Sequence, residues 1–334
     1  MNIENKSELI NYLQGEHGII TRYTDKFSIL RGGVSNKTIL YEGQELSMVV
    51  KQALKKLRTK SSWYSNPARL KVEANALDWL NFILPDNTVP KRIFLDEKNI
   101  ILGMEAVSQP HDNLKELLLN GFPADDLIEK MGELLGIIHT SGFNDDNAKK
   151  IFFDQTYFRN LRIEPYYEYS AAEKPELKEF FIDLITNTLS NRHTIVHGDY
   201  SPKNILIKNN KLVLLDHEVL HNGDPAFDVG FALTHFLSKS NHFNDPVFIK
   251  YASIFWSSYM TRFSFPDTSF EERCVNHTLA CMIARVYGRS PLEYLTATQR
   301  LRQSEITMKL IHEKLKTPPQ LFEQFKQNLE HHSI

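Results

Sequence analysis

Apolar positions in the N-terminal third of the chain follow two different spacings. Short runs alternate apolar and polar residues, the period of a half-buried strand, whereas two longer runs repeat every three to four residues, as on one helix face. Gly32-Gly33 and Glu42-Gly43-Gln44 are turn signals between the first short runs. The pattern predicts strands over 27–31, 37–42 and 46–51, a hairpin from 92–95 and 99–104, and helices over 7–17 and 68–84.

Past Val107 the spacing becomes mainly helical. A polar stretch over 108–113 connects the two parts. The helical pattern predicts helices over 113–120, 124–140, 174–190, 226–239, 246–262, 270–288 and 296–316, with a short β patch at 194–196, 205–207 and 212–215. We therefore expect an α+β fold of two lobes. Residues 1–107 would form a small lobe around an antiparallel sheet, and residues 108–334 a larger helical lobe.

Composition narrows the classes of protein that fit. The 334 residues carry 39 Lys and Arg against 41 Asp and Glu, a net charge of −2. This balance provides no general attraction for nucleic acid or for an anionic membrane surface. No apolar run approaches the roughly 20 residues that span a bilayer, and the N-terminus lacks the pattern of a signal peptide. We expect a cytoplasmic protein without nucleic-acid or membrane partners.

The two cysteines do not suggest a disulfide framework. Cys274 and Cys281 lie seven residues apart, on one face of a predicted helix, and His277 lies between them. A metal site is one interpretation of this trio. Buried core cysteines are the interpretation that we prefer.

The strongest chemical signal is the segment His197-Gly198-Asp199-Tyr200-Ser201-Pro202-Lys203-Asn204, followed by Asp216-His217-Glu218 at the end of an apolar run. Phosphoryl transfer needs a positioned acceptor hydroxyl and neutralised phosphate charge. Asp199 suits the base that orients the hydroxyl, and the oxygens of Asn204 and Asp216 suit Mg²⁺. The Asp-x-x-x-x-Asn spacing matches the catalytic loop of protein kinases.

Two other interpretations of this segment remain. One is a surface turn with ordinary polar residues. The other is a metallohydrolase that uses His197, Asp199, His217 and Glu218, although these residues lack the i, i+4 histidine spacing of a helical zinc site.

Residues that precede this segment in the sequence are typical of a nucleotide-binding site. Gly32 and Gly33 would let backbone amides approach phosphate oxygens, and Ser35 and Asn36 complete that loop. Lys51 ends an apolar strand, from which its ammonium group could reach the phosphates of ATP. Glu73 on the following helix is the expected partner of Lys51, with Glu97 and Glu105 as alternatives.

The end of the last predicted strand in the small lobe is the expected adenine contact. There Glu105 would offer its carbonyl and Val107 its amide, with Met104 packing behind the base. Farther along, Asp228 begins a predicted helix. We expect it to accept hydrogen bonds from backbone amides of the loop at 197–204 and to act as a structural brace.

These motifs together resemble the aminoglycoside phosphotransferase/choline kinase superfamily. HGDYSPKN, DHE and GDPAFD match that superfamily's pattern at Asp199, Asn204, Asp216, Asp224 and Asp228. The resemblance implies a bilobal protein-kinase-like fold, ATP and Mg²⁺ as cofactors, and phosphate transfer to a small-molecule hydroxyl acceptor.

A second resemblance is partial. The stretch VKQAL at 50–54, then Arg58, Trp63, Arg69 and Glu73, is similar to the corresponding region of 5-methylthioribose kinases. It implies that Glu218 joins the metal site. The segment after Asp199 departs from the HGDLHTGS of those enzymes, so a methylthioribose-like sugar is the leading acceptor and not a settled one.

The acceptor has several candidates. Residues 255–334 hold ten Lys and Arg against eight Asp and Glu, which suits a neutral or anionic acceptor better than a polycation. Arg285 and Arg289 lie one helical turn apart and could bind it together, or could belong to a solvated basic face. Aminoglycoside or choline/amino-alcohol phosphotransferase is the alternative activity, and a nucleotide-binding pseudokinase is the alternative class. The sequence leaves the oligomeric state open.

Overall fold

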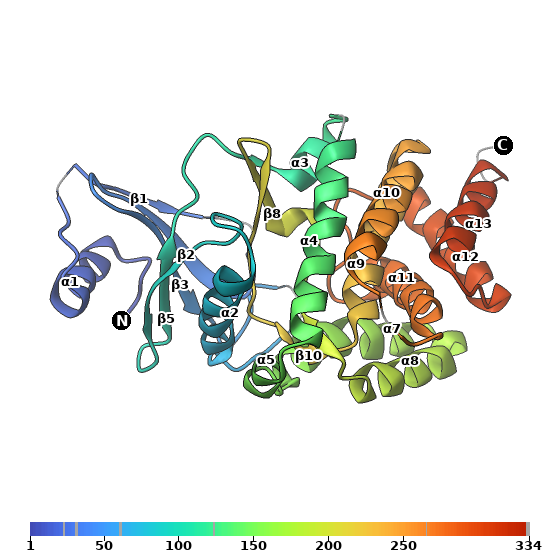
Figure 1. Ribbon diagram of the computed structural model, residues 1–334, viewed down its shortest axis with the longest axis horizontal. Coiled ribbons are helices and arrows are strands. Elements are labelled where there is room, and N and C mark those ends of the chain that lie inside the picture. Colours follow the sequence, from blue (N-terminus) through green and yellow to red (C-terminus); the bar gives the residue numbers. More distant parts are fainter. Residues whose placement is uncertain (23, 31–32, 60–61, 123, 265, 332–334) are drawn as a thin grey trace. The chain divides into compact units, whose positions relative to one another are not determined.

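The computed structural model describes residues 1–22, 24–30, 33–59, 62–122, 124–264 and 266–331 (Figure 1). The chain divides into two compact units. The first comprises Met1–His111 together with Val213–Val219, and the second comprises Asp112–Leu212 and Leu220–Ile334. The chain therefore leaves the second unit after Leu212 and returns to it at Leu220. The hydrophobic pattern carries no signal for this excursion.

A five-stranded antiparallel sheet forms the centre of the first unit, in the order β1-β2-β3-β5-β4. Its central strand, β3, places Lys51 opposite Thr38 of β2 and Leu102 of β5. The strands are β1 (Lys26–Ile29), β2 (Asn36–Glu42), β3 (Ser47–Ala53), β4 (Arg92–Asp96) and β5 (Ile101–Glu105). The last predicted residue of the first strand, Arg31, lies outside the described residues.

Two helices, α1 (Lys6–His17) and α2 (Arg69–Ile83), pack against this sheet. Val50 shares a cluster with residues of α1, whereas Val49 and Ala53 share another with residues of α2. Successive side chains of a strand point to opposite faces. The side chain of Lys51 is therefore on the same face as those of Val49 and Ala53, toward α2.

Helices make up most of the second unit. They are α3 (Leu114–Leu119), α4 (Asp125–Phe143), α5 (Asp146–Ile151), α6 (Thr156–Phe158), α7 (Tyr169–Glu173), α8 (Lys178–Ser190), α9 (Pro225–Phe243), α10 (Val247–Arg262), α11 (Phe270–Tyr287), α12 (Ala297–Glu313) and α13 (Pro318–His331), with a π-helical segment at Arg159–Glu168 and 3₁₀ turns at Pro175–Leu177 and Pro202–Asn204. The short strands are β6 (Asp112–Asn113), β7 (Thr194–Val196), β8 (Ile205–Lys208), β9 (Lys211–Leu214) and β10 (His221–Gly223). The last two residues of β9, Val213 and Leu214, already belong to the first unit.

The long helices pack side by side through close backbone contacts. α10 lies against α4 and α9, and α9 lies against α11 (Figure 1). A Cβ on Gly132 of α4 would come within 2.4 Å of the Phe255 carbonyl oxygen, and one on Gly230 of α9 within 2.7 Å of the Thr278 amide nitrogen. Both glycines therefore set how closely their helices approach. This packing holds the start of α9 in place.

The predicted α+β fold, with strands in the N-terminal part and helices after it, is confirmed. Several elements were missed. The π-helical segment Arg159–Glu168 contains Pro165, and a π turn does not show the 3.6-residue period. The helix predicted over 296–316 ends at Glu313, because Lys314 adopts a left-handed conformation with φ of 52°.

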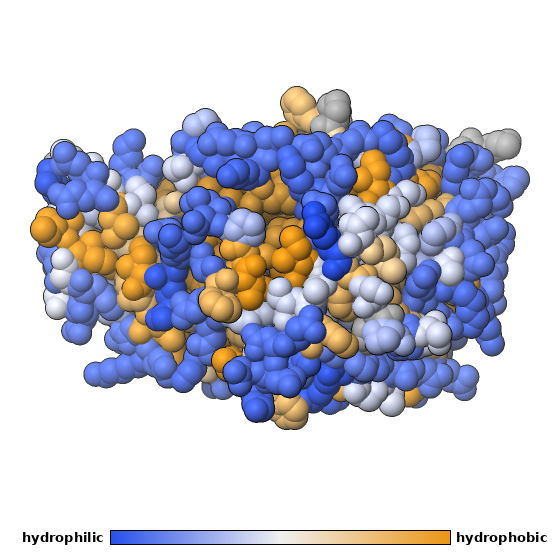
Figure 2. Space-filling view, viewed as in Figure 1, coloured by the Kyte–Doolittle hydropathy of each residue, from blue (hydrophilic) through white to orange (hydrophobic). Residues whose placement is uncertain are grey.

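The last helix, α13, was also missed, although its pattern is regular. Leu321, Phe325 and Leu329 follow an i, i+4, i+8 spacing and are buried, whereas Glu323 and Lys326 are exposed. Figure 2 shows the corresponding hydrophilic surface over α12 and α13. None of the described helices combines the length and the apolar content that a bilayer crossing requires.

Candidate active site

Lys51 and Glu73 form an ion pair in the first unit. The Lys51 Nζ lies 2.5 Å from Glu73 Oε1 and 3.3 Å from Asp216 Oδ1. Glu73 is fully buried on α2, on the face that meets the sheet. Of the alternative partners, Glu97 pairs with Lys71 at the surface, and Glu105 is exposed at the end of β5. The order of residues along the chain therefore identified the right acidic partner of Lys51.

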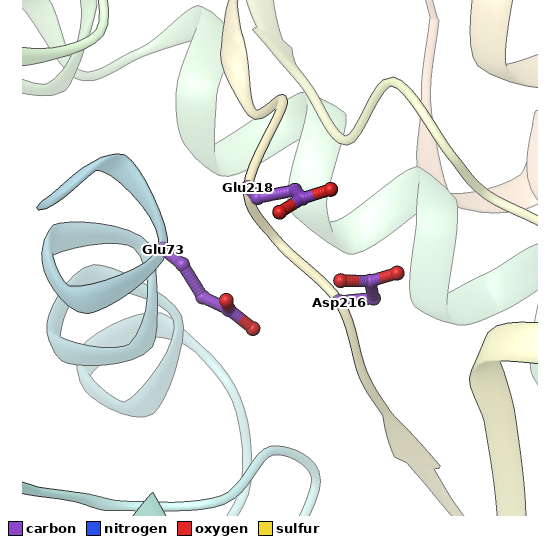
Figure 3. Close-up of side chains that lie close together, drawn as sticks. All are labelled: Glu73, Asp216 and Glu218. Carbon is purple, nitrogen blue, oxygen red and sulfur yellow. The ribbon is translucent and has the colours of Figure 1, made fainter. Parts of the chain in front are cut away.

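Asp216 and Glu218 bring two more carboxylates to Glu73. Each of the three residues offers an oxygen, and these oxygens lie within 4.8 Å of one another (Figure 3). Asp216 has a φ of 68°, a left-handed conformation that is uncommon outside glycine, asparagine and aspartate. This turn in the chain directly after β9 lets Asp216 and Glu218 both join the cluster.

Arg69 and Asn36 hold Glu218 in the cluster. Glu218 Oε2 accepts hydrogen bonds from Arg69 Nε at 3.0 Å and from Asn36 Nδ2 at 2.9 Å. Arg69 is completely buried, and its guanidinium group also donates to the carbonyls of Ser35 and Leu54. Ser35 and Asn36 thus bind Glu218 and Arg69 here. Sequence reasoning noted Arg69 only as part of a resemblance and missed this contact.

The charges of this cluster are not balanced. Three carboxylates face the two cations Lys51 and Arg69, and the second oxygen of Glu73 is buried with no hydrogen-bond partner in the described ranges of the chain. Burial raises the pKa of Glu73 to about 7, opposed by the charge of Lys51 and reinforced by Asp216 and Glu218. Burial opposes the charge of Lys51, but the surrounding carboxylates hold the pKa of Lys51 above its usual value. The cluster is thus suited to accept further positive charge.

The remaining predicted nucleotide contacts are only partly described. Gly32 lies outside the described residues. Gly33 is described, and there is open space where a Cβ on it would lie. Met104 is buried on β5, where it pairs with Val49. The amide of Val107 has no hydrogen-bond partner among the described residues, so it is available to a ligand.

Asp199 lies in the second unit and is held on both sides. Its Oδ1 is 2.9 Å from Arg162 Nη2, and its Oδ2 accepts a hydrogen bond of 2.7 Å from Asn204 Nδ2. Arg162 also donates to the Gly198 carbonyl at 2.7 Å. Since Asn204 uses its amide nitrogen on Asp199, its amide oxygen is the atom that remains for a metal. Arg162 belongs to the π-helical segment and was missed by sequence reasoning.

Asp228 lies behind the loop that carries Asp199. Its two carboxylate oxygens accept hydrogen bonds from the His197 amide at 2.6 Å and the Gly198 amide at 2.8 Å. His139 Nε2 lies 3.2 Å from the same side chain, which is fully buried. Burial alone would raise the pKa of Asp228, but the hydrogen bond and charge of His139 and the amides of the loop bring it below its usual value. These contacts tie the loop to the start of α9.

Arg285 and Arg289 do not share a helix face as we expected. α11 ends at Tyr287, and the backbone at Gly288 is extended. Arg289 then pairs with Glu164 at 2.8 Å, whereas the largely buried Arg285 points back into the unit and donates to the Ser290 carbonyl. The two guanidinium groups therefore have separate surroundings.

The described residues give no support to histidine or cysteine ligands for a metal. The grouping of three potential metal ligands found among them consists of Glu73, Asp216 and Glu218 alone. Cys274 and Cys281 are both fully buried free thiols. Tyr167 contacts His277 Nδ1 at 2.8 Å and Cys281 Sγ at 3.4 Å, so this trio belongs to the core.

Comparisons with known proteins agree with the fold and these side chains. Residues 26–259 match the model of a family described as phosphotransferase enzyme family, APH. This match covers most of the chain. The chain belongs to the APH phosphotransferase enzyme family, and its fold is the protein-kinase-like fold of that family.

Two curated relatives are methylthioribose kinases. Methylthioribose kinase 1 of Oryza sativa subsp. japonica is 24% identical over 258 residues, which are 67% of this chain and 60% of the relative. Methylthioribose kinase of Escherichia coli O45:K1 (strain S88 / ExPEC) is 24% identical over 233 residues, 61% of this chain and 55% of the relative. The chain therefore spans little more than half the length of these relatives.

Solved structures share the fold at low sequence identity. An amicoumacin kinase, solved in complex with AMP-PNP and Ca²⁺, has a TM-score of 0.63 at 12% identity, over 94% of this chain and 95% of that one. The choline kinase of Cryptosporidium parvum Iowa II has a TM-score of 0.55 at 15% identity, over 93% and 98% of the two chains.

Proposed function

We propose that this phosphotransferase moves the γ-phosphate of ATP to a hydroxyl group of a small metabolite, with Mg²⁺ as the metal. The observation that carries the proposal is the position of Lys51, whose ammonium group lies between Glu73 and Asp216. Such a lysine, fixed by a buried glutamate and a metal-binding aspartate, is the arrangement that protein kinases use for the nucleotide phosphates.

The proposed step needs one base and no covalent intermediate. The acceptor oxygen bonds to the γ-phosphorus, the bond from that phosphorus to the β–γ bridging oxygen breaks, and ADP leaves with the electron pair. Asp199 takes the proton of the acceptor hydroxyl. Since Arg162 and Asn204 each hold one of its oxygens, the carboxylate is oriented before the acceptor binds.

The residues present fit a divalent metal. The candidate ligands are the oxygens of Asn204, Asp216 and Glu218, and hard oxygen donors suit Mg²⁺. The excess negative charge of the cluster and the unpartnered buried oxygen of Glu73 favour a bound cation. When bound, the ion would offset the charge of the phosphates. The AMP-PNP and Ca²⁺ complex of the amicoumacin kinase supports a nucleotide and a divalent ion in this fold.

Met104, Glu105 and Val107 are the proposed adenine contacts. Gly32, Gly33, Ser35 and Asn36 are the proposed loop over the phosphates. The free amide of Val107 supports the first assignment. Because Asn36 also binds Glu218, its substitution would affect both the loop and the metal ligands.

For the acceptor we propose a small sugar, with a methylthioribose-like sugar as the leading candidate. The names of the curated relatives support this choice, as does the stretch at 50–54 with Arg69 and Glu73. An aminoglycoside or an amino-alcohol such as choline is less suitable, because the largely buried Arg285 adds positive charge to the unit that holds Asp199, whereas Arg289 is already paired with Glu164. A cationic acceptor would be repelled there.

The test is phosphate transfer from ATP by purified protein, with Mg²⁺, to methylthioribose, other sugars, choline and aminoglycosides. We expect one acceptor class to be phosphorylated and Asp199→Asn to lower kcat by about 10²- to 10⁴-fold with little change in ATP affinity. The exposed Asp183→Asn on α8 is the matched control and should behave as wild type. Removing Mg²⁺ with EDTA should abolish transfer.

Binding of ATP without transfer to any acceptor would contradict this proposal and favour a pseudokinase. Equal losses of kcat and ATP affinity in Asp199→Asn would contradict the role of Asp199 as the base.

A further inference from the structure

A lysine is buried inside the second unit with almost no hydrogen bonding. Lys239 lies on α9 with none of its surface exposed. Among the described residues it makes one hydrogen bond, a long one of 3.4 Å from Nζ to the His235 carbonyl in the preceding turn. An ammonium group has three protons to donate, and a buried charge without partners is costly. The proposed phosphoryl transfer does not use Lys239.

The neighbours of Lys239 add positive charge. Arg285 Nη2 lies 3.4 Å from His235 Nε2. A guanidinium group can only donate, so His235 accepts through Nε2 and is neutral. Burial and the charges of Arg285 and Lys239 also hold the pKa of His235 well below its usual value. His235 therefore cannot neutralise either cation.

Within the part of the chain that the structure describes, the carboxylate of this region that forms an ion pair with a neighbouring lysine is that of Glu293. Glu293 forms an ion pair with Lys115 and is 68% exposed, so its partnership is a surface one. Burial first, and then Lys115 and Arg285, lower the pKa of Lys239 to about 7, although Glu293 and Glu116 act in the opposite direction. The cationic cluster, defined as Lys115, Lys239 and Arg285, thus exceeds the negative charge that compensates it.

Two buried polar atoms beside the cationic cluster also have no hydrogen-bond partner among the residues that the structure describes. They are Arg285 Nε and the hydroxyl of Tyr294, whose ring lies 5.5 Å from Lys239 Nζ. Unsatisfied buried donors are rare in folded proteins and call for a specific explanation. Tyr294 and Glu293 belong to the segment between α11 and α12. Donors with weak partners or with none among the described residues thus come from α9, α11 and this segment.

The cationic cluster is connected to Asp199 through two shared rings. The Cζ of Arg162, which holds Asp199, lies 5.9 Å from the ring centroids of both Tyr166 and Phe231. The Cζ of Arg285 lies 4.9 Å and 5.1 Å from the same two centroids. The two guanidinium groups thus flank one pair of rings. Arg285 is therefore a near neighbour of Arg162, the residue that holds Asp199.

We propose that the second unit binds the acceptor by an anionic group, a carboxylate or a phosphate, through Arg285, Lys239, Lys115 and the Tyr294 hydroxyl. This inference rests on the proposed function and makes it more specific, because the acceptor becomes a sugar acid or a sugar phosphate. It departs from methylthioribose, which is uncharged. The anion takes the place of the exposed Glu293 beside Lys115 and provides the partner that Lys239 lacks.

The first test measures thermal unfolding with inorganic phosphate or with malate, a small hydroxycarboxylate, in the absence of ATP. We expect at least one anion to raise Tm by about 3–6 °C near saturation, and the responding anion shows whether phosphate or carboxylate is preferred. Lys239→Met and Arg285→Gln should lose this response. Lys326→Gln, an exposed change on α13, is the control and should keep it.

Lys239→Met also separates loss of binding from loss of folding. Without an anion this variant should be at least as stable as wild type. The substitution removes a buried charge and fills the same space with an uncharged side chain of similar volume. An equal shift in Tm in wild type, Lys239→Met and Arg285→Gln would overturn the inference. A shift that is lost in Lys51→Met but kept in Arg285→Gln would also overturn it, because the anion would then bind in the first unit.

The second test compares acceptors. Ribose 5-phosphate or gluconate should be phosphorylated more efficiently than methylthioribose, and Arg285→Gln should remove about 10- to 100-fold of that preference. A preference for methylthioribose that is unchanged in Arg285→Gln would overturn the inference and leave the kinase proposal intact. If no ATP binds but the shift in Tm still depends on Arg285 and Lys239, the kinase proposal fails and the anion site stands.

Discussion

Arg162 is the residue that most changes the interpretation of Asp199. Its guanidinium group binds the Asp199 carboxylate and the Gly198 carbonyl together, so it fixes both the side chain and the backbone of the loop. A carboxylate held through both of its oxygens keeps one orientation, in which it can align the acceptor hydroxyl and take its proton. Arg162 is thus a positioning residue.

We predict that Arg162→Gln lowers kcat by about 10- to 100-fold while the KM for ATP stays nearly constant, because a small misplacement of Asp199 affects the transition state most. Arg162→Lys should restore part of the loss, since it keeps the charge but not the forked geometry. Steady-state kinetics of both variants measures this. If kcat in both variants fell in the same proportion as the amount of folded protein, the result would contradict a positioning role.

At the same scale, sequence reasoning proposed Lys51, Glu73, Asp199, Asn204 and Asp216 as site residues because each occupies a fixed place in an ordered motif. Arg69 and Arg162 belong to no such motif, and their partners are distant in the sequence. A buried arginine is recognised only once the carboxylate that it meets is located. The same holds for Lys239, whose position on α9 resembles any polar residue of a helix until its burial is known.

At the scale of elements, α9 links the loop of Asp199 to the helical core. Its first turn carries Asp224, which caps the helix and pairs with Arg273 at 2.7 Å, and Asp228, which binds the loop. The sequence predicted this helix from Ala226, close to its observed start at Pro225. It could not predict that His139 on α4 would also contact Asp228, because that contact depends on how the helices pack.

We predict that Asp228→Asn lowers the free energy of unfolding by about 2 kcal/mol or more, because it removes an acceptor from a buried amide and a charge beside His139. Asp78→Asn, which breaks an exposed ion pair with Arg92, should cost about 1 kcal/mol or less. Urea unfolding of both variants provides the comparison, and similar costs would contradict the bracing role.

The pH dependence of that difference has a definite sign. The pKa of Asp228 in the folded protein is below its ordinary value of 3.8. At pH values between the folded pKa and 3.8, the unfolded chain therefore binds more protons than the folded protein. The stability that Asp228 contributes is therefore fully present above pH 3.8 and lost as the pH falls through the folded pKa. The wild type and Asp228→Asn should differ in stability near neutral pH and converge in acid.

At the scale of the whole molecule, the hydrophobic pattern predicted strands before helices but not the excursion of residues 213–219 into the first unit. The pattern reports which faces are buried, and not which neighbours bury them. Within the first unit, Leu214 donates its amide to the Thr88 carbonyl at 2.8 Å, and Asp216 and Glu218 bind Lys51 and Arg69. This short segment is therefore part of the first unit's structure.

We predict that a backbone cut in the exposed stretch between Ser108 and His111 does not release the first unit, because 213–219 remains in place. A protease site inserted there, followed by size-exclusion chromatography, measures this, with the uncut insertion protein as control. A fragment of residues 1–111 alone should not unfold cooperatively, since Arg69 would be left buried without Glu218. Clean separation of two folded pieces would contradict both expectations.

The excursion of 213–219 also bears on how such enzymes can diversify. A recombination that exchanged the N-terminal unit at a single crossover would separate Lys51 and Glu73 from the Asp216 and Glu218 that lie beside them. The chimera would have to accommodate foreign carboxylates in a charge cluster that leaves no spare contacts for Arg69. Changes within α9, α11 and the segment between α11 and α12, where we propose the anion site, would leave this charge cluster intact.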